Sequence, residues 1–187
     1  MKKKKRFGAS DWVDLGLAEL SKNGAEAVKL EAICEMAQRT RGSFYYHFED
    51  HSAFLLALAQ SWTKRQTADV AQNLNADGTA HDKASALTEA SLEIDFRLEL
   101  GIRELARRYP SIASVVKAAD KKRLKILSEI YAQRFQLDPS EAEDFAFLEY
   151  AAFSGMILLT PDMPLRKQRE LATLYDGLIQ NTLSTKS

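Results

Sequence analysis

The chain has 187 residues, of which 45% are hydrophobic and 28% charged, and its 26 basic residues balance 26 acidic ones. This is the composition of a folded globular protein with enough length for one core or two small ones. No apolar run approaches the 18 residues of a membrane-spanning helix, and a lone cysteine, Cys34, excludes an internal disulfide and a thiolate-rich zinc site. We therefore expect a cytoplasmic protein without a membrane partner.

Helix-forming residues dominate the sequence. Only 8 glycines and 4 prolines interrupt a chain rich in Ala, Leu, Glu, Lys, Arg and Gln. The sequence shows no strand pattern and no internal repeat, so the predicted fold class is all-α.

Positive charge gathers at the start of the chain. Residues 1–48 hold nine basic and six acidic residues, a net charge of +3, and MKKKKR is the most basic stretch of all. Residues 1–8 form a basic arm, for which a solvated tail and a nucleic-acid contact are both open interpretations.

The first part of the chain predicts a compact unit of short helices. Apolar residues recur at helical spacing in residues 10–24 and again in residues 30–37. Thr40 and Asp50 are residue types that cap helices, so a third short helix is expected after Thr40 and a fourth after Asp50. Together these segments predict a three-helix unit that leads into a connecting helix.

Longer helices are expected after the polar stretch NLNADGTAHD. Pro110 marks one boundary, and Asp138 followed by Pro139 is a strong signal for a helix start. The expected helices cover residues 82–108, 111–136, 139–160 and 165–183. The predicted organisation is a basic arm (1–8), a domain of short helices (9–50) and a domain of long helices (51–187) that begins with the connecting helix (51–74).

The stretch RTRGSFYYHFEDHSAF, residues 39–54, concentrates aromatic, hydroxyl and imidazole groups around one glycine. Phe44 and Phe48 lie four residues apart and are expected in the core. The remaining Arg, Ser, Tyr and His side chains then face outward, where arginine can pair with guanine and hydroxyls can contact phosphates. A helix of this kind in a helix-turn-helix lies in the major groove of DNA.

The two halves of this motif carry a family resemblance. ICEMAQRT is similar to I-A-x-x-A-G-V-S, and RGSFYYHFEDHSAF to K-G-T-L-Y-x-H-F-x-S-K-E-x-L, both from the tetracycline-repressor (TetR) family. Residues 12–58 resemble the DNA-binding domain of that family, and the long helices resemble its ligand-binding and dimerisation domain. The resemblance implies a transcriptional regulator, a repressor that binds a palindromic operator in double-stranded DNA as a homodimer and is released by a small-molecule effector.

The resemblance also implies roles for individual residues. The residues implied in base contacts are Arg41, Gly42 and Tyr45, and those implied in phosphate contacts are Lys29, Arg39, Thr40, Ser43, Tyr46, His47 and His51. Three departures from the family pattern stand out. Gln38-Arg39 replaces the usual Gly-Val of the turn, His51 replaces a lysine, and Val28-Lys29 replaces two threonines, which leaves the second helix without its usual cap.

Two further sets of residues concern the part of the chain after residue 50. The resemblance implies an effector pocket there, and its candidate lining is Trp62, Phe96, Leu100, Tyr131 and Phe135. The candidate dimer interface, in helices whose small residues permit close packing, is Phe145, Leu148, Ala152, Gly155, Met156, Leu171, Leu174 and Leu178. The same spacings also fit a filled core within one chain, since periodicity does not distinguish a cavity or an interface from packing.

Other functions receive little support from the sequence. His47 and His51 lack the H-E-x-x-H pattern, and the Asp50 cap assigns them to different helices, so no metal is predicted. Cys34 lies on an apolar helix face, which indicates a core residue rather than a nucleophile. We predict no enzyme and no cofactor. The alternative to DNA binding is a helical protein-interaction module without sequence-specific DNA binding.

Overall fold

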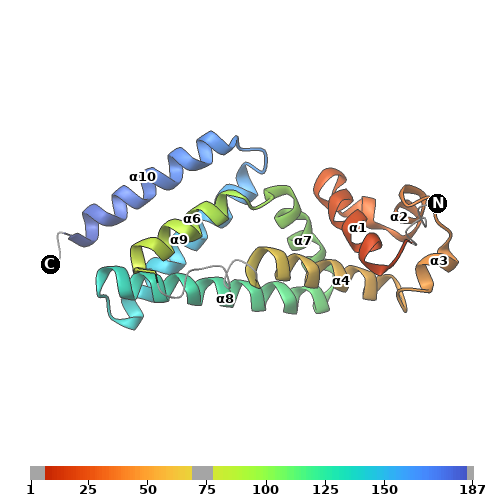
Figure 1. The fold of residues 1–187 in the computed structure, drawn as a ribbon, viewed down its shortest axis with the longest axis horizontal. Helices are drawn as coiled ribbons and strands as arrows, with labels where there is room; N and C mark the ends of the chain where they lie inside the picture. The colour runs from red at the N-terminus through yellow and green to blue at the C-terminus, as the bar shows by residue number, and fades with distance from the viewer. Residues whose placement is uncertain (1–6, 69–77, 185–187) are drawn as a thin grey trace, which may run out of the picture. The chain divides into compact units, whose positions relative to one another are not determined.

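The computed structural model describes residues 7–68 and 78–184, and every element in this part of the chain is helical (Figure 1). The all-α prediction is therefore confirmed. The elements are α1 (Ala9–Asn23), η1 (Ala25–Val28), α2 (Leu30–Met36), α3 (Arg41–Tyr45), α4 (His51–Thr63), the π-helix η2 (Lys64–Ala68), α6 (Ala80–Leu92), α7 (Phe96–Arg108), α8 (Pro110–Phe135), α9 (Pro139–Leu159) and α10 (Leu165–Ser184). Among these, no helix is both long enough and apolar enough to cross a membrane.

The helices pack into two compact units. The first unit combines the described residues up to Arg65 with Arg97–Ala118, and the second combines Gln66–Phe96 with the described residues from Ala119 onward. These units do not follow the predicted boundary at residue 50, because α4 and α7 pack against α1. A Cβ built at Gly16 would lie 2.7 Å from side-chain atoms of Phe54 and Leu58, and one at Gly101 would lie 2.8 Å from Leu20.

An aromatic cluster forms the core of the first unit. The ring of Phe44 is fully buried and lies 5.4 Å from Trp12, 5.2 Å from Phe48 and 5.3 Å from Phe54, measured between ring centroids. The contacts of Phe44 with Trp12 and Phe54 are edge-to-face, and aromatic pairs of this kind contribute about 0.5–1.5 kcal/mol each beyond the area they bury. The prediction that Phe44 and Phe48 anchor the third helix is confirmed.

The expected single helix over residues 82–108 is wrong. The chain forms α6 and α7 instead, with a break at residues 93–95. The amides of Glu93 and Ile94 bond to carbonyls only three residues back, and the Ser91 hydroxyl also bonds back to Thr88 O. Tight turns of this kind end a helix. The apolar residues of the segment 82–108 therefore belong to two units, with α6 in the second unit and most of α7 in the first.

The predicted helix starts agree with the observed caps. The side chains of Thr40, Asp50 and Asp138 accept hydrogen bonds from the amides of Ser43, Ala53 and Glu141 at 3.2, 2.7 and 3.0 Å. As expected, α2 begins without a side-chain cap at Lys29. Pro110 is the first residue of α8, where its missing N–H costs nothing.

Two predicted segments lie partly outside the described residues. Residues 1–6 of the predicted basic arm and residues 69–74 of the predicted connecting helix are outside the described ranges. Within the described residues, the connecting helix runs as α4 to Thr63 and then changes to the π-helix η2.

The second unit surrounds a smaller apolar cluster. Its buried members come from α8, α9 and the end of α10: Leu127, Tyr131, Ala142, Ala146 and Leu183. α6 also packs near α10 (Figure 1). These four helices enclose the cavity described below.

Candidate DNA-binding surface and internal cavity

The turn between α2 and α3 is held by backbone hydrogen bonds. The amide of Gln38 bonds to Glu35 O at 2.9 Å, and the amide of Arg39 bonds to Cys34 O at 3.0 Å. Gln38 has φ +51°, in the left-handed region where glycine is favoured. The turn therefore keeps the backbone conformation suited to the family's usual glycine although glutamine occupies the position.

Helix α3 buries one face and exposes the other. Phe44 points into the aromatic core, whereas Tyr45 and Tyr46 are 50% and 71% exposed. Gly42 is also exposed, and a Cβ there would meet only the Thr40 hydroxyl, at 3.8 Å. Since nothing in the fold requires a glycine at this position, the open backbone is free to approach a ligand.

Arg41 is exposed but paired. Its Nη2 lies 2.6 Å from Oε1 of Glu31 on α2, and both side chains are more than half exposed. An exposed ion pair of this type contributes about 0–1 kcal/mol, so it is easily exchanged for a stronger acceptor.

The turn residues offer further donors beside α3. Arg39 is exposed; its guanidinium lies 5.3 Å from the ring centroid of Phe7, and its Nη1 donates to Gln38 O at 3.1 Å. The Thr40 hydroxyl caps α3 by accepting from the Ser43 amide. Thr40 and Ser43, which both carry hydroxyl groups, lie at the start of α3 close to Gly42 in the sequence.

The remaining predicted phosphate contacts surround this helix. His47 packs edge-on against Tyr46 at 4.9 Å between ring centroids. Nε2 of His51 lies 2.7 Å from Val28 O, and since a carbonyl only accepts, this nitrogen carries the hydrogen. Lys29 forms an ion pair with Glu26, which also contacts Arg108. His51 thus has a structural contact that the sequence did not reveal.

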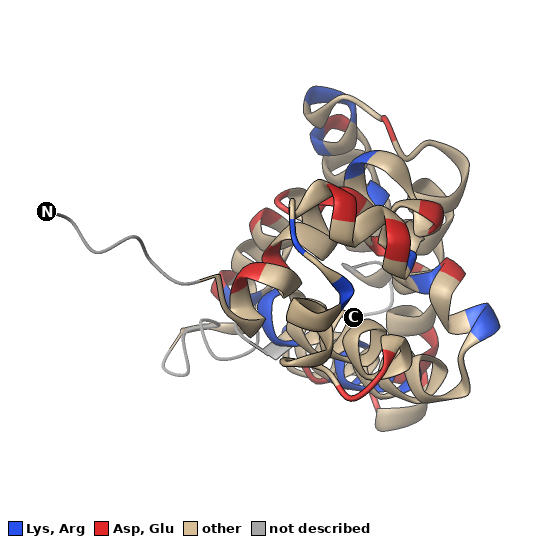
Figure 2. Ribbon diagram, turned by 90° about the vertical axis from the view of Figure 1, so that its right-hand side faces the viewer, with Lys and Arg blue, Asp and Glu red and all other residues tan. Residues whose placement is uncertain are grey.

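In Figure 2, the Lys and Arg segments of the ribbon are interspersed with Asp and Glu segments. Arg39 and Arg41 are exposed cations at and beside the start of α3, where they would attract a polyanion.

Cys34 is buried behind the turn, as expected for a core residue. Burial raises the pKa of its thiol, so the reactive thiolate is disfavoured. Among the described residues, no three His, Cys, Asp or Glu side chains gather in a way that could hold a metal ion.

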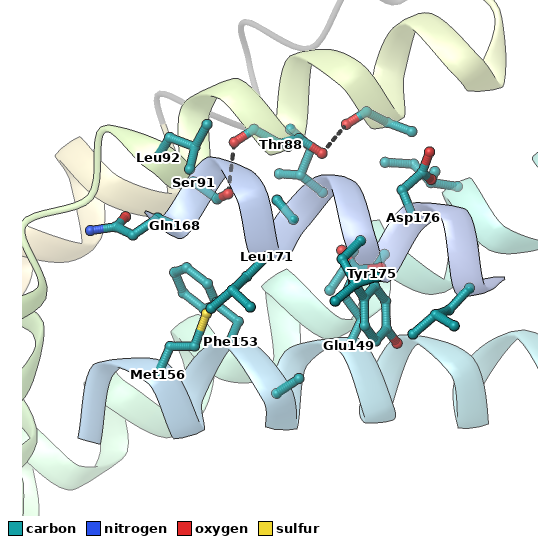
Figure 3. Close-up of a pocket in the computed structure, with 18 of the residues that line it drawn as sticks. Thr88, Ser91, Leu92, Glu149, Phe153, Met156, Gln168, Leu171, Tyr175 and Asp176 are labelled. Carbon is teal, nitrogen blue, oxygen red and sulfur yellow. Dashed lines mark hydrogen bonds between the residues drawn. The ribbon is translucent and has the colours of Figure 1, made fainter. Parts of the chain in front are cut away.

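A cavity of about 350 Å³ lies in the second unit, between α6, α8, α9 and α10 (Figure 3). Three of the predicted lining residues, Phe96, Tyr131 and Phe135, do line it. Trp62 and Leu100 are not among its lining residues. Trp62 is fully buried in the first unit, where its indole N–H donates to Glu99 Oε2 at 3.0 Å.

One end of this cavity is polar, which sequence analysis did not predict. In Figure 3, Glu149, Tyr175 and Asp176 lie toward one end, and Leu92, Phe153 and Met156 toward the other. A signal was present, because Glu149 is the one carboxylate in the apolar run FAFLEYAAF, residues 145–153. A lone charge in such a run identifies a polar contact only once its neighbours from other helices are known.

The predicted interface residues divide between this cavity and the surface. Five of them line the cavity: Ala152, Met156, Leu171, Leu174 and Leu178. Leu174 and Leu178 are also 60% and 58% exposed, so they belong to the surface as well. Phe145 stacks on Tyr131 within the chain at 5.8 Å between ring centroids. Leu148 is exposed, and a Cβ at Gly155 would meet no atom within 4 Å.

Helix α9 also exposes apolar residues that the sequence did not single out. Phe147, Leu158 and Leu159 are more than 60% exposed, and Leu148 lies beside them. Their spacing of 11 residues (147 to 158 and 148 to 159) places them on one stripe of the helix, with Gly155 between them. The stripe Phe147, Leu148, Gly155, Leu158 and Leu159 is called the α9 stripe below.

A short helix with a buried aromatic face and an exposed Arg-Gly-Tyr-Tyr face, set after a tight turn, defines a helix-turn-helix DNA-binding protein. Residues 13–58, from α1 to α4, match the family model described as bacterial regulatory proteins, tetR family. This part of the chain is therefore similar to the DNA-binding domain of that family. Proteins of this family are transcription factors rather than enzymes.

Solved structures show the same fold. A transcriptional regulator from Rhodococcus sp. Rha1 has 16% identity and a TM-score of 0.78, over 93% of this chain and 96% of that chain. A candidate regulator from Saccharomonospora viridis in complex with choline has 13% identity and a TM-score of 0.77, over 89% and 94%. The ketosteroid regulator KstR2 of Mycobacterium tuberculosis has 17% identity and a TM-score of 0.65, over 97% and 96%. No curated protein sequence matches the chain significantly.

Proposed function

We propose that this protein is a cytoplasmic transcriptional repressor that binds a palindromic operator as a homodimer and leaves it when a small molecule binds. The observation that carries the proposal is the exposed face of α3, whose polar groups have no role in the core. Residues 9–50 are the DNA-binding part and residues 51–187 the effector and dimerisation part, although α4 and α7 pack with the former.

In this proposal α3 enters the major groove. Arg41 and Tyr45 read base edges, and the bare backbone of Gly42 permits the close approach. The cations and hydroxyls around it hold phosphates: Lys29, Arg39, Thr40, Ser43, Tyr46, His47 and His51. Phosphate contacts fix the register of the protein on the duplex, while the base contacts select the sequence.

The proposed homodimer uses the α9 stripe. A row of large exposed apolar residues around a glycine is costly in water and suits a second helix at short distance. Two recognition helices related by a two-fold axis then read an inverted repeat, because one helix contacts too few base pairs for use in a genome. Leu148 and Gly155, predicted from the sequence, belong to this stripe.

The proposed effector site is the cavity of the second unit. Its volume falls in the range of cavities that hold small molecules, and one structural relative was solved with choline while another is a ketosteroid regulator. Arg123 on α8 donates to Thr67 Oγ1 at 3.0 Å and to Tyr150 OH at 3.2 Å, which ties the end of η2 to α8 and α9.

Selection of bound fragments from genomic DNA, followed by mobility-shift assays over a range of salt concentrations, tests the function. We expect an enriched inverted repeat and an affinity that falls steeply with salt. Absence of any enriched duplex at low salt would refute DNA regulation and favour a protein-interaction module. A monomer in sedimentation that still binds the repeat with full affinity would refute the dimer.

A further inference from the structure

At the polar end of the cavity, the Asp176 carboxylate is paired with a cation from the described part of the chain and the Glu149 carboxylate is not. Among the described residues, Arg134 is the one cation that lines this cavity, and its Nη1 lies 2.7 Å from Oδ1 of Asp176. The other Asp176 oxygen accepts from Gln180 at 2.7 Å. Asp176 is therefore satisfied on both oxygens. Arg134 is committed to Asp176 and to the ring of Phe135, 4.9 Å away.

Glu149 is left without a cation of its own. Its Oε2 accepts from the Tyr131 hydroxyl at 2.6 Å, and its Oε1 takes no hydrogen bond from a described residue. Burial raises the pKa of Glu149, and this effect outweighs the lowering by the Tyr131 hydrogen bond; the Asp176 carboxylate raises the pKa further, and Arg134 lowers it by a smaller amount. The nearby Arg123 is engaged by Thr67 and Tyr150 instead.

The rest of the wall suits a positive, largely apolar molecule. Five aromatic rings line the cavity (Phe96, Tyr131, Phe135, Phe153 and Tyr175), and the faces of such rings attract cations. The Tyr175 hydroxyl lies close to the Tyr131 hydroxyl, and Oε1 of Gln168 is buried without a hydrogen-bond partner among the described residues. The open carboxylate oxygen and the Gln168 oxygen accept hydrogen bonds and cannot donate them.

We propose that the effector cavity is specific for organic cations with an apolar or aromatic body, and that Glu149 is the residue that recognises the positive group. The proposal rests on the effector site proposed above and names its ligand class. Desolvation penalises the charge of the half-buried Glu149 carboxylate, and a bound cation offsets that penalty where a neutral molecule of the same shape does not. An anion in the cavity would lie near the Glu149 carboxylate, while the Arg134 guanidinium is already paired with Asp176.

Calorimetry on the full chain with matched probes tests the proposal. Benzyltrimethylammonium is the cation, neopentylbenzene is its neutral isostere with carbon in place of nitrogen, and 3-phenylpropanoate is the anion. We expect the cation to bind at least ten-fold more tightly than the isostere and the anion to bind more weakly than both. Met156→Trp, which fills the apolar end of the cavity, should abolish binding of all three.

The variants Glu149→Gln and Glu149→Asp identify the recognising group. Glu149→Gln keeps an acceptor for Tyr131 but not the charge, so the ten-fold preference for the cation should disappear while the isostere binds as before. Glu149→Asp retains the charge and should retain a preference. Glu143→Gln removes a charge from an exposed position on the same helix and should change nothing. Thermal unfolding of each variant verifies that it is folded.

Equal affinities of the wild type for the cation and its isostere would overturn the proposal, as would an unchanged preference in Glu149→Gln or cation binding that survives Met156→Trp. The DNA function fails separately. A chain that binds the cation through Glu149 but selects no duplex refutes the regulator and leaves the ligand class standing. A chain that binds its operator but shows no preference for the cation refutes the proposed ligand class and leaves the regulator function standing.

Discussion

Nη2 of Arg41 lies 2.6 Å from Oε1 of Glu31, which joins the first residue of α3 to the second residue of α2. The pair holds the proposed base-reading guanidinium against the neighbouring helix. DNA must compete with the carboxylate for the guanidinium, and the carboxylate itself repels phosphates.

Removing this competitor should strengthen DNA binding. Glu31→Gln is expected to raise operator affinity by up to about five-fold, because an exposed pair is worth no more than about 1 kcal/mol. Glu35→Gln, which removes the same charge from an exposed site on α2, should give a smaller gain. Equal gains in mobility-shift titrations at fixed salt would mean that only overall charge matters.

Gly42 should be required for DNA binding and not for folding. Gly42→Leu is expected to lower operator affinity at least ten-fold while the melting temperature stays within a few degrees, because a side chain there meets open space. Ala18→Leu adds similar bulk at an exposed position of α1 and should alter neither property. Loss of stability in Gly42→Leu would show that the glycine serves packing.

Tyr45 and Tyr46 form a natural comparison, since they are adjacent and both exposed. Tyr45→Ala should reduce discrimination between the operator and a mutated duplex by about 1–3 kcal/mol, as expected for a lost base contact. Tyr46→Ala should weaken all duplexes by a similar factor, as for a phosphate contact, and leave the salt dependence unchanged because the phenol carries no charge. The same pattern in both variants would contradict the assigned roles.

The α9 stripe should control the oligomeric state. Leu158→Glu places a charge among exposed apolar residues and is expected to give a monomer in sedimentation, with at least ten-fold weaker binding to an inverted repeat. Gln133→Glu adds the same charge at an exposed position of α8 and should leave the dimer intact. A dimer that persists in Leu158→Glu would move the interface elsewhere.

Cation binding should depend on pH through Glu149. Because the pKa of Glu149 is raised, its ionised form grows in as pH rises above the usual carboxyl range, and benzyltrimethylammonium should bind more tightly over that rise. In the protein without ligand, the effect of pH on folding stability has the opposite sign. The folded state holds this proton more strongly than the unfolded state, so the contribution to stability is present at low pH and lost as pH rises through the raised pKa.

The variant Glu149→Gln supplies the reference for this prediction. It should flatten both the pH dependence of cation binding, measured by calorimetry, and the matching slope in the free energy of unfolding, measured with urea. The other titratable groups facing Glu149 are Tyr131 and Arg134 on α8 and Tyr175 and Asp176 on α10, and all remain in the variant. An unchanged slope would assign the titration to another group.

The sequence by itself determined the features that depend on local signals. Helix caps at Thr40, Asp50 and Asp138, the aromatic anchor Phe44 and the exposed Arg-Gly-Tyr-Tyr face could all be read from residue type and spacing. These features involve neighbours within about four residues, so their physics is contained in a short stretch of chain. The same stretch carries the family motif.

Only the tertiary structure decided what each apolar helix face contacts. Periodicity predicted one helix through residues 93–95 and treated Trp62 as pocket lining, because a face that packs on a core and a face that lines a cavity have the same spacing. Glu149, Arg134 and Asp176 come from three different helices, and their charge balance exists only after those helices pack. Long-range packing, which a single sequence does not encode in any local pattern, therefore decided the chemistry of the effector cavity.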